Sequence, residues 1–189
     1  MGKVLRIFKK IRLSLQHSCG YIFFLCLLKT RLVIPKQKPK AEQRGAFVSK
    51  VSAQDMNRFF RDNFTGNPDA LPDITLAEPD HVIMRASMGE QNIRPGGFVS
   101  GPTQMQLADH IAYAVIFTRL GITPMALTSN LNIDFLRPLK GDVITAAGKM
   151  IKLGRALAVI SVEIWGDNPD KISSRATVTY ALPQNQPDI

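Results

Sequence analysis

The chain has 189 residues, of which 45% are hydrophobic and 21% are charged, a composition that fits one globular domain and excludes disorder through most of its length. The formal net charge of +9 is concentrated at the N-terminus, where the first 45 residues hold 11 Lys and Arg and a single acid, Glu42. The remaining residues hold 13 basic and 14 acidic side chains, so the body gives no electrostatic reason to expect a nucleic-acid partner.

We assign residues 1–46 to a basic N-terminal extension and residues 47–189 to the domain. Basic residues flank an apolar helical face at the start of the extension, and an apolar run follows from Cys19 to Leu28. That run is about half of the ~20 residues that span a bilayer, and no small-residue cleavage site follows it. Three explanations stay open: an anchor making weak contact with a membrane surface, an organelle presequence, or upstream sequence without a structural role.

The two cysteines, Cys19 and Cys26, both lie in the extension, so the body has no cysteine for a disulfide or a thiolate metal site. The three histidines lack the spacing of metal ligands. We therefore expect no metal and no cofactor. A cytoplasmic location is expected, with membrane association or organelle targeting through the basic N-terminus as alternatives.

The first elements of the domain alternate between helical and extended patterns. Ser52 is a plausible N-cap for a short helix whose apolar face includes Met56 and Phe60. Residues 74–88 are expected to be extended, and a glycine-rich segment follows over residues 89–101. The longest helix is predicted over residues 102–120, with Ser100 as its N-cap and Gly121 just past its end. This stretch is largely apolar and leaves little polar surface, so we expect it to be covered nearly all round.

Four long runs after this helix alternate apolar and polar residues, over 126–137, 142–153, 156–165 and 172–182, and hairpin-sized turns separate them. Consecutive strands joined by short turns predict an antiparallel meander. One buried helix across the concave face of such a sheet gives an α+β domain of the hot-dog architecture.

Asp109 is the outlier within the apolar helix. An ionised carboxylate in a covered site costs several kcal/mol unless it is paired, and the sequence offers no Lys or Arg within one turn. Either it faces solvent or pairs with Gln106, Tyr113 or a backbone amide, or it is a base or nucleophile held in a partly dry cleft.

The start of the same helix is a second candidate element, because exposed N–H groups there favour negative charge on a carbonyl oxygen. Gly101 would let a substrate approach the backbone, although a capped helix start explains the same residues. Eight residues separate Gly101 from Asp109, which is about 12 Å of helix. Groups acting on one carbonyl must lie within roughly 4 Å of it. A catalytic role for both therefore requires two subunits with antiparallel helices.

At this point the sequence resembles the phenylacetate-degradation-type hot-dog thioesterases, over about Ser52 to Leu182. The residues that carry the resemblance are Arg94-Pro95-Gly96-Gly97-Phe98-Val99-Ser100-Gly101-Pro102, Leu107-Ala108-Asp109, residues 130–138, Gly141-Asp142 and Gly154-Arg155. In that family a His-Gly-Gly motif precedes the acidic residue by the same interval. Ser100 stands here in the place of the histidine, and Pro102 in the place of the second glycine.

The resemblance implies roles for individual residues. The Gly101 amide would polarise a thioester carbonyl, and Asp109 of the other subunit would attack it or activate water. Thr128, with Ser129 beside it, matches the hydroxyl residue that positions the water. Asn92 is the nearest match to an asparagine that orients the thioester.

Further residues are candidates for binding the substrate. Tyr113, Met105 and Phe117 are apolar candidates for contact with the acyl group, or else core residues. Arg155, with Lys152, is placed at a turn where it could meet the phosphates of coenzyme A, or it is simply solvated. Arg137 could pair with Asp134 or Asp142.

The leading hypothesis is a homo-oligomeric acyl-coenzyme A thioesterase, a dimer or a dimer of dimers, without a metal or redox cofactor. The changes at Ser100 and Pro102 motivate an alternative, a non-catalytic protein that binds acyl thioesters on the same fold. A third possibility makes the basic extension the functional part, as a binder of membrane surfaces or anionic polymers.

Overall fold

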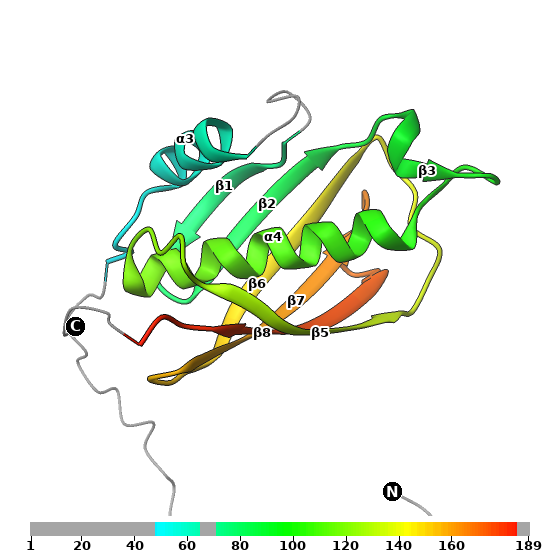
Figure 1. Ribbon diagram of the computed structural model, residues 1–189. Helices are drawn as coiled ribbons and strands as arrows, with labels where there is room; N and C mark the ends of the chain where they lie inside the picture. The colour runs from blue at the N-terminus through cyan, green and yellow to red at the C-terminus, as the bar shows by residue number, and fades with distance from the viewer. Residues whose placement is uncertain (1–47, 65–70, 185–189) are drawn as a thin grey trace, which may run out of the picture. The chain divides into compact units, whose positions relative to one another are not determined.

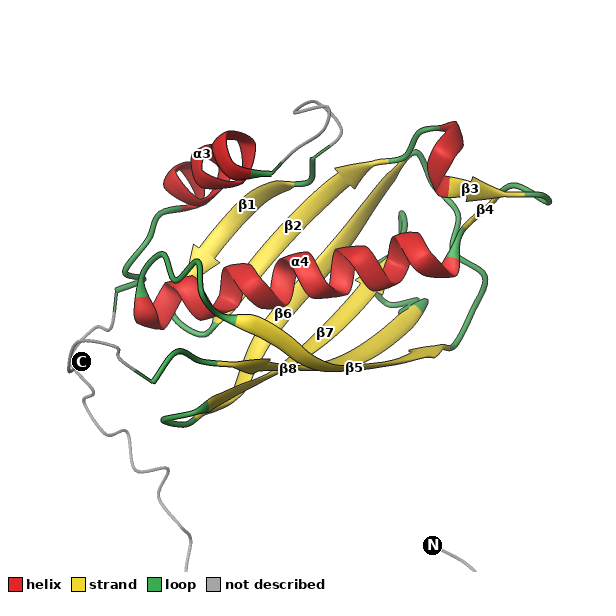
Figure 2. Cartoon of the chain, in the orientation of Figure 1, coloured by secondary structure: helices red, strands yellow, loops and turns green. Residues whose placement is uncertain are grey.

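One six-stranded antiparallel sheet with a long helix lying across it forms the described part of the chain (Figures 1 and 2). The computed structural model describes residues 48–64 and 71–184, so the predictions for residues 1–46 lie outside it. The predicted α+β hot-dog architecture is confirmed. None of the helices within these two ranges is long and apolar enough to cross a membrane.

The long helix, α4 (Gly101–Leu120), begins and ends where the sequence predicts. The Ser100 hydroxyl accepts a hydrogen bond from the Thr103 amide, and Gly121 follows the helix with a φ of 82°, which favours glycine. The helix crosses the inner face of the sheet, where Ile111 and Val115 are fully buried (Figure 2). Small side chains beside them, Ala108 and Ala112, bring the helix close to its neighbours.

The sheet has the order β1-β2-β6-β7-β8-β5, and every adjacent pair is antiparallel. Its strands are β1 (Asp73–Glu78), β2 (His81–Ser87), β5 (Leu127–Phe135), β6 (Val143–Leu153), β7 (Leu157–Trp165) and β8 (Ser174–Ala181). Before α4, the chain forms the 3₁₀ turn η2 (Glu90–Asn92) and then a short hairpin. The hairpin consists of β3 (Ile93–Arg94) and β4 (Phe98–Val99).

The predicted meander is correct only for β6, β7 and β8. Strand β5 pairs with β8 at the edge of the sheet, so the segment after β5 is a crossover rather than a hairpin (Figure 1). Leu139 anchors that crossover in the core, and its carbonyl accepts a hydrogen bond from Val99. A short crossover and a hairpin loop have similar composition, so the local sequence did not separate them.

The extended stretch predicted over residues 74–88 is likewise two strands. A turn at Asp80, whose φ is 65°, folds β1 back onto β2. The alternation of residues predicts that Leu76, Val82 and Met84 face inward; Val82 and Met84 are buried, and Leu76 is half-buried.

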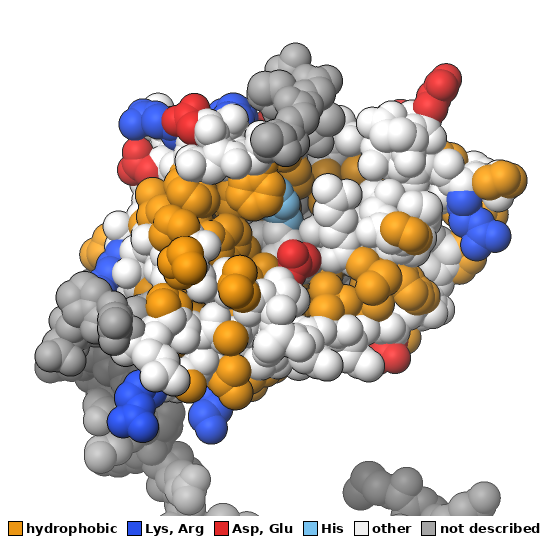
Figure 3. Space-filling model, viewed as in Figure 1, with side chains coloured by type: hydrophobic (Ala, Val, Ile, Leu, Met, Phe, Trp, Pro, Cys, Tyr) orange, Lys and Arg blue, Asp and Glu red, His pale blue; other side chains and the backbone are white. Residues whose placement is uncertain are grey.

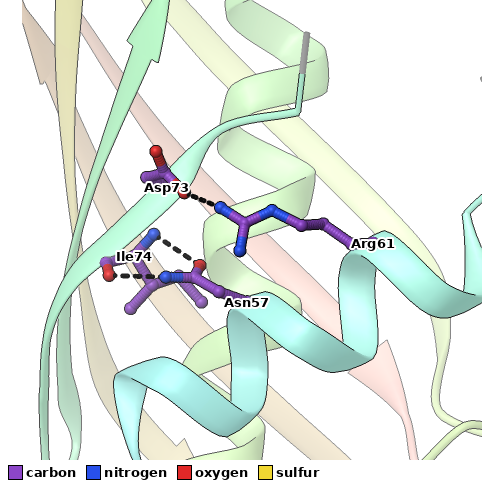
Figure 4. A network of polar contacts seen from close by, with 4 residues as sticks. All are labelled: Asn57, Arg61, Asp73 and Ile74. Atoms are coloured by element: carbon purple, nitrogen blue, oxygen red, sulfur yellow. Dashed lines mark hydrogen bonds and ion pairs between the residues drawn. The ribbon is translucent and has the colours of Figure 1, made fainter. Parts of the chain in front are cut away.

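The first helix, α3 (Ala53–Asn63), has the predicted N-cap, since Ser52 accepts a hydrogen bond from the Asp55 amide. Figure 4 shows how it covers the free edge of β1. The Asn57 side chain donates to the Ile74 carbonyl (3.0 Å) and accepts from the Ile74 amide (2.8 Å). It thereby satisfies the two backbone groups that an adjacent strand would satisfy. Arg61 pairs with Asp73 beside it.

The expectation that α4 is covered nearly all round is wrong on one side. A stripe of the helix stays exposed or half-exposed, and we call it the open stripe: Pro102, Met105, Gln106, Asp109 and Tyr113. Phe117, an acyl-contact candidate, is fully buried in the core instead. The face seen in Figure 3 carries hydrophobic side chains around an acidic one.

The first prediction concerns the contact between α4 and β6. A Cβ atom added at Gly148 would lie 2.8 Å from Val115 Cγ2 and 3.1 Å from Ile111 Cγ1, both of fully buried side chains. We expect Gly148→Ala to lower the free energy of unfolding by about 1–3 kcal/mol, because such overpacking forces the helix and the sheet apart. Urea denaturation measures this. Ala147→Ser, at the half-buried neighbouring position, is the control, and equal losses in both variants would contradict the prediction.

Candidate functional site

Asp109 lies half-buried on the open stripe and accepts hydrogen bonds from two hydroxyl groups at one carboxylate oxygen. Thr128 Oγ1 lies 2.6 Å from its Oδ1, and the Tyr180 hydroxyl lies 2.8 Å from the same atom. The Tyr180 hydroxyl is also 3.1 Å from the Asp109 backbone carbonyl oxygen. The partners weighed from the sequence, Gln106 and Tyr113, are therefore not the ones that satisfy this carboxylate.

The sheet register brings these groups together. Thr128 on β5 and Tyr180 on β8 are directly opposed across the antiparallel pair, and α4 passes over that pair at Asp109. The next residue, Ser129, lies at an irregularity of the register, and its hydroxyl donates to the Thr179 carbonyl (3.2 Å). Ser129 is thus directed at β8, while Thr128 is directed at the carboxylate.

Tyr180 is the functional candidate that the sequence analysis missed. It is 3% exposed, and its ring stacks on that of Tyr113 with centroids 5.7 Å apart and planes 5° from parallel. Burial, with smaller contributions from neighbours including Asp109, raises the pKa of Tyr180 well above its ordinary value, so its hydroxyl keeps its proton. The sequence signal was an aromatic residue at an inward position of a strand, which is also the pattern of a core residue.

Tyr113 lies on the open stripe, half-buried, and donates a hydrogen bond to the Thr123 carbonyl (3.2 Å). Burial also raises its pKa. Met105, on the same stripe, is 41% exposed.

A second group of predicted residues lies together at the start of α4. The Ser100 amide donates to the Asn92 carbonyl (2.8 Å), which brings η2 against Ser100 and Gly101. The Asn92 side-chain oxygen accepts a hydrogen bond from the Gly89 amide (2.9 Å) within its own turn. Ser100 Oγ lies 2.8 Å from Thr103 Oγ1 and caps the helix.

A groove of about 670 Å³, lined by both apolar and polar residues, adjoins Gly101. Phe98 and Phe135 line it, together with the crossover after β5 and with Gln104. The buried Gln104 side chain donates to the Val99 carbonyl (3.1 Å). Arg137, at the rim, donates to the Ile172 carbonyl (2.6 Å), so this contact takes the place of the predicted pairing with Asp134 or Asp142.

The two groups are separated within one chain. Gly101 and Asp109 lie on one uninterrupted helix, so the eight-residue interval corresponds to about 12 Å along its axis. Arg155 belongs to neither group and lies exposed between β6 and β7. The structure thus brings Asp109 and Thr128 together, and separately Asn92, Ser100 and Gly101.

His110 follows Asp109 but points into the core. It is 8% exposed, its ring centroid lies 4.5 Å from that of Phe60, and its Nε2 has no hydrogen-bond partner in the described part of the chain. Burial lowers the pKa of His110, and the charge of Asp109 opposes that shift. Within residues 48–64 and 71–184, no three His, Cys, Asp or Glu side chains are grouped so that they could hold a metal ion.

Comparison with known proteins gives a consistent picture. The sequence profile of the thioesterase superfamily matches residues 96–173, which include both groups of candidate residues except Asn92 and Tyr180. No curated protein matches the sequence.

Solved structures share the fold over most of their length. A Silicibacter protein assigned as a thioesterase has 28% sequence identity and a TM-score of 0.65, and the match covers 74% of this chain and 96% of that one. Zebrafish thioesterase superfamily member 2 has 22% identity and a TM-score of 0.62, over 70% and 99%. A hypothetical thioesterase from Streptococcus pneumoniae, solved with coenzyme A, has 22% identity and a TM-score of 0.53, over 59% and 88%.

The second prediction concerns His110. The unfolded chain binds a proton there near pH 6.5, whereas the folded chain does so only at lower pH. The free energy of unfolding should therefore fall as the pH drops below about 6.5, by up to about 1.4 kcal/mol per unit until the folded pKa is reached. Between pH 7.5 and 5.5, the free energy of unfolding of His110→Gln should fall by about 1 kcal/mol less than that of the wild type. Urea denaturation at the two pH values measures this difference. Equal losses would contradict a buried neutral histidine.

Proposed function

We propose that this hot-dog domain is a thioesterase that hydrolyses acyl-coenzyme A thioesters to the free acid and coenzyme A, and the match of the thioesterase superfamily profile to residues 96–173 supports this. The observation that supports this most directly is the Asp109 carboxylate, which lies on the open stripe and is satisfied by hydroxyl groups rather than by a cation. A carboxylate within reach of a reacting carbonyl can act as a general base or as a nucleophile.

The start of α4 supplies the complementary group. The Gly101 amide N–H would donate to the thioester oxygen as negative charge develops there, with the positive end of the helix dipole behind it. Ser100 caps the helix, and Asn92 lies beside it, where its side chain would orient the thioester. The groove next to Gly101 offers space for part of the substrate.

Two routes fit Asp109. As a general base it takes a proton from water, the oxygen attacks the carbonyl carbon, the C–S bond breaks and the sulfur receives the proton. As a nucleophile it displaces the thiolate to form an anhydride, which water then hydrolyses. Thr128, with Ser129 beside it, lies where a hydroxyl could hold that water. Neither route needs a redox cofactor.

Both groups can meet one carbonyl only if they come from two subunits. About 12 Å of helix separates them in one chain, against the roughly 4 Å that joint action requires. If two α4 helices run antiparallel with Gly101 of one beside Asp109 of the other, residue 105 lies on the two-fold axis. Met105 lies there on the open stripe, 41% exposed, as an interface position requires.

Strand β5 offers the second half of such an interface. It is the last strand of the sheet, and all nine of its residues are exposed or half-exposed. Its Leu127 and Phe135 are 64% and 52% exposed. An unpaired edge strand favours pairing with another chain, and antiparallel pairing of two β5 strands would be compatible with antiparallel helices. We propose a dimer, or a dimer of dimers.

The remaining substrate contacts extend the proposal. Tyr113 and Met105, on the open stripe, would lie near the acyl group, and Arg155 would meet a phosphate of coenzyme A. We propose a cytoplasmic enzyme, with weak contact of residues 1–46 with membrane surfaces as the alternative role of the extension. The full chain should therefore hydrolyse its substrate without lipid.

The third prediction tests Asp109. Asp109→Asn should reduce thiol release from acyl-coenzyme A by about 10²–10⁴-fold, because the amide can neither take a proton nor attack. The assay covers short, branched, aromatic and long acyl groups, and Asp170→Asn, at an exposed turn, is the matched control. If the wild type binds acyl-coenzyme A without releasing thiol, the protein is a binder rather than an enzyme. Undiminished hydrolysis by Asp109→Asn would reject the assigned role.

The fourth prediction tests the shared site by complementation. Gly101→Pro removes the amide hydrogen at a helix start, where proline is tolerated, so this variant and Asp109→Asn should each be inactive. In a mixed dimer one site receives both changes and the other receives none, so random mixing should restore about a quarter of wild-type thiol release. Subunits are mixed by unfolding and refolding, and each variant refolded alone is the control. No recovery despite mixed dimers would mean that both groups act within one chain.

A further inference from the structure

We propose that Tyr180 is a positioning residue that fixes one oxygen of Asp109, Oδ1, and leaves Oδ2 as the oxygen that reacts. This inference rests on the proposed function, since it assigns a task to the contact that Tyr180 makes with the catalytic carboxylate.

The contact is directional. The Tyr180 hydroxyl lies 2.8 Å from Oδ1 and 3.1 Å from the backbone carbonyl oxygen of Asp109. Both atoms only accept, so the tyrosine must donate its hydrogen. Thr128 donates to the same oxygen (2.6 Å), and no hydrogen bond from residues 48–64 or 71–184 reaches Oδ2. One carboxylate oxygen is therefore held and the other is left for substrate or water.

The two donors differ in how firmly they are held. Thr128 is exposed, so water can replace its hydroxyl. Tyr180 is 3% exposed, belongs to the β-ladder between β7 and β5, and has its ring stacked on Tyr113. Tyr180 is thus the donor that water cannot easily replace. It joins the end of the carboxylate to the rigid sheet, which limits rotation of the Asp109 side chain.

The groups that contact the Asp109 carboxylate are hydroxyl groups rather than cations. Tyr180 faces it from β8, Thr128 from β5, and His110 and Tyr113 are its neighbours on α4. His110 is kept neutral by burial. No Lys or Arg within the described ranges forms an ion pair with Asp109. Within the described ranges, the donors that hold Asp109 are therefore the Thr128 and Tyr180 hydroxyl groups.

The test removes the hydroxyl in the full-length protein. Tyr180→Phe should lower kcat for thiol release about tenfold with little change in KM, and should move the acid limb of the kcat/KM profile up by about one pH unit. Tyr113→Phe removes a neighbouring hydroxyl from the same ring stack without touching Asp109, so its acid limb should stay in place. In His110→Gln, the acid limb of the kcat/KM profile should likewise stay at the wild-type pH.

A second variant acts in the opposite direction and barely changes the packing. The chain has three tyrosines, so in a Tyr21→Phe, Tyr113→Phe background fluorotyrosine enters only at position 180. A more acidic hydroxyl donates more strongly, so the acid limb should move to lower pH. An acid limb that moves in neither variant, whatever happens to stability, overturns the proposal.

The two failures can be told apart. If Asp109→Asn hydrolyses substrate normally, the proposed function of Asp109 fails, and this inference fails with it. If Asp109→Asn is inactive while both tyrosine variants keep the wild-type pH profile, the function stands and Tyr180 is only a structural residue.

Discussion

The packing of α4 against the inner face of the sheet is the contact on which the rest of the structure depends. Ile111 and Val115 are completely buried there, and Gly148 on β6 leaves no room for a side chain beneath them. Close packing of this kind fixes both the height of the helix over the sheet and its rotation about its own axis. The rotation decides which residues face away, so the open stripe is a consequence of the buried one.

The same rigidity gives the candidate site its form. An uninterrupted helix of 20 residues keeps Gly101 and Asp109 at a nearly constant separation, and no loop motion can bring them to one carbonyl. The proposed reaction therefore requires Gly101 from one subunit and Asp109 from a symmetry-related second subunit. Met105, midway between them, is 41% exposed, and β5 has one open edge, so both are available for the dimer contact that we propose.

The hydrogen bonds to the Asp109 carboxylate come from hydroxyl groups on two paired strands of the sheet. Thr128 and Tyr180 are neighbours only because β5 pairs with β8, and their shared target is a carboxylate supplied by another element. A cation in their place would stabilise the carboxylate too, but it would also weaken it as a base. His110, the next residue on the same helix, is buried, and that burial lowers its pKa and favours its neutral form.

Local patterns in the sequence were sufficient for much of the fold. Both helices were identified from their capping residues, Ser52, Ser100 and Gly121. Most of the sheet was identified from the alternation of the later strands. Caps and periodicity act over a few residues, so the local sequence contains them. The sequence also singled out Asp109 as a carboxylate that an apolar helix does not explain. The interval to Gly101 predicted a site shared between two subunits.

Tertiary structure alone decided the rest. Whether the segment after β5 is a hairpin or a crossover depends on which edge of β8 is free, and that is not encoded near Pro138. Asp109 and Tyr180 are 71 positions apart, and the sequence between them likewise carries no local signal of their contact. The sequence by itself determined which elements form and which carboxylate is anomalous. Only the strand order decided what satisfies that carboxylate, because register across a sheet is a property of the whole packed domain.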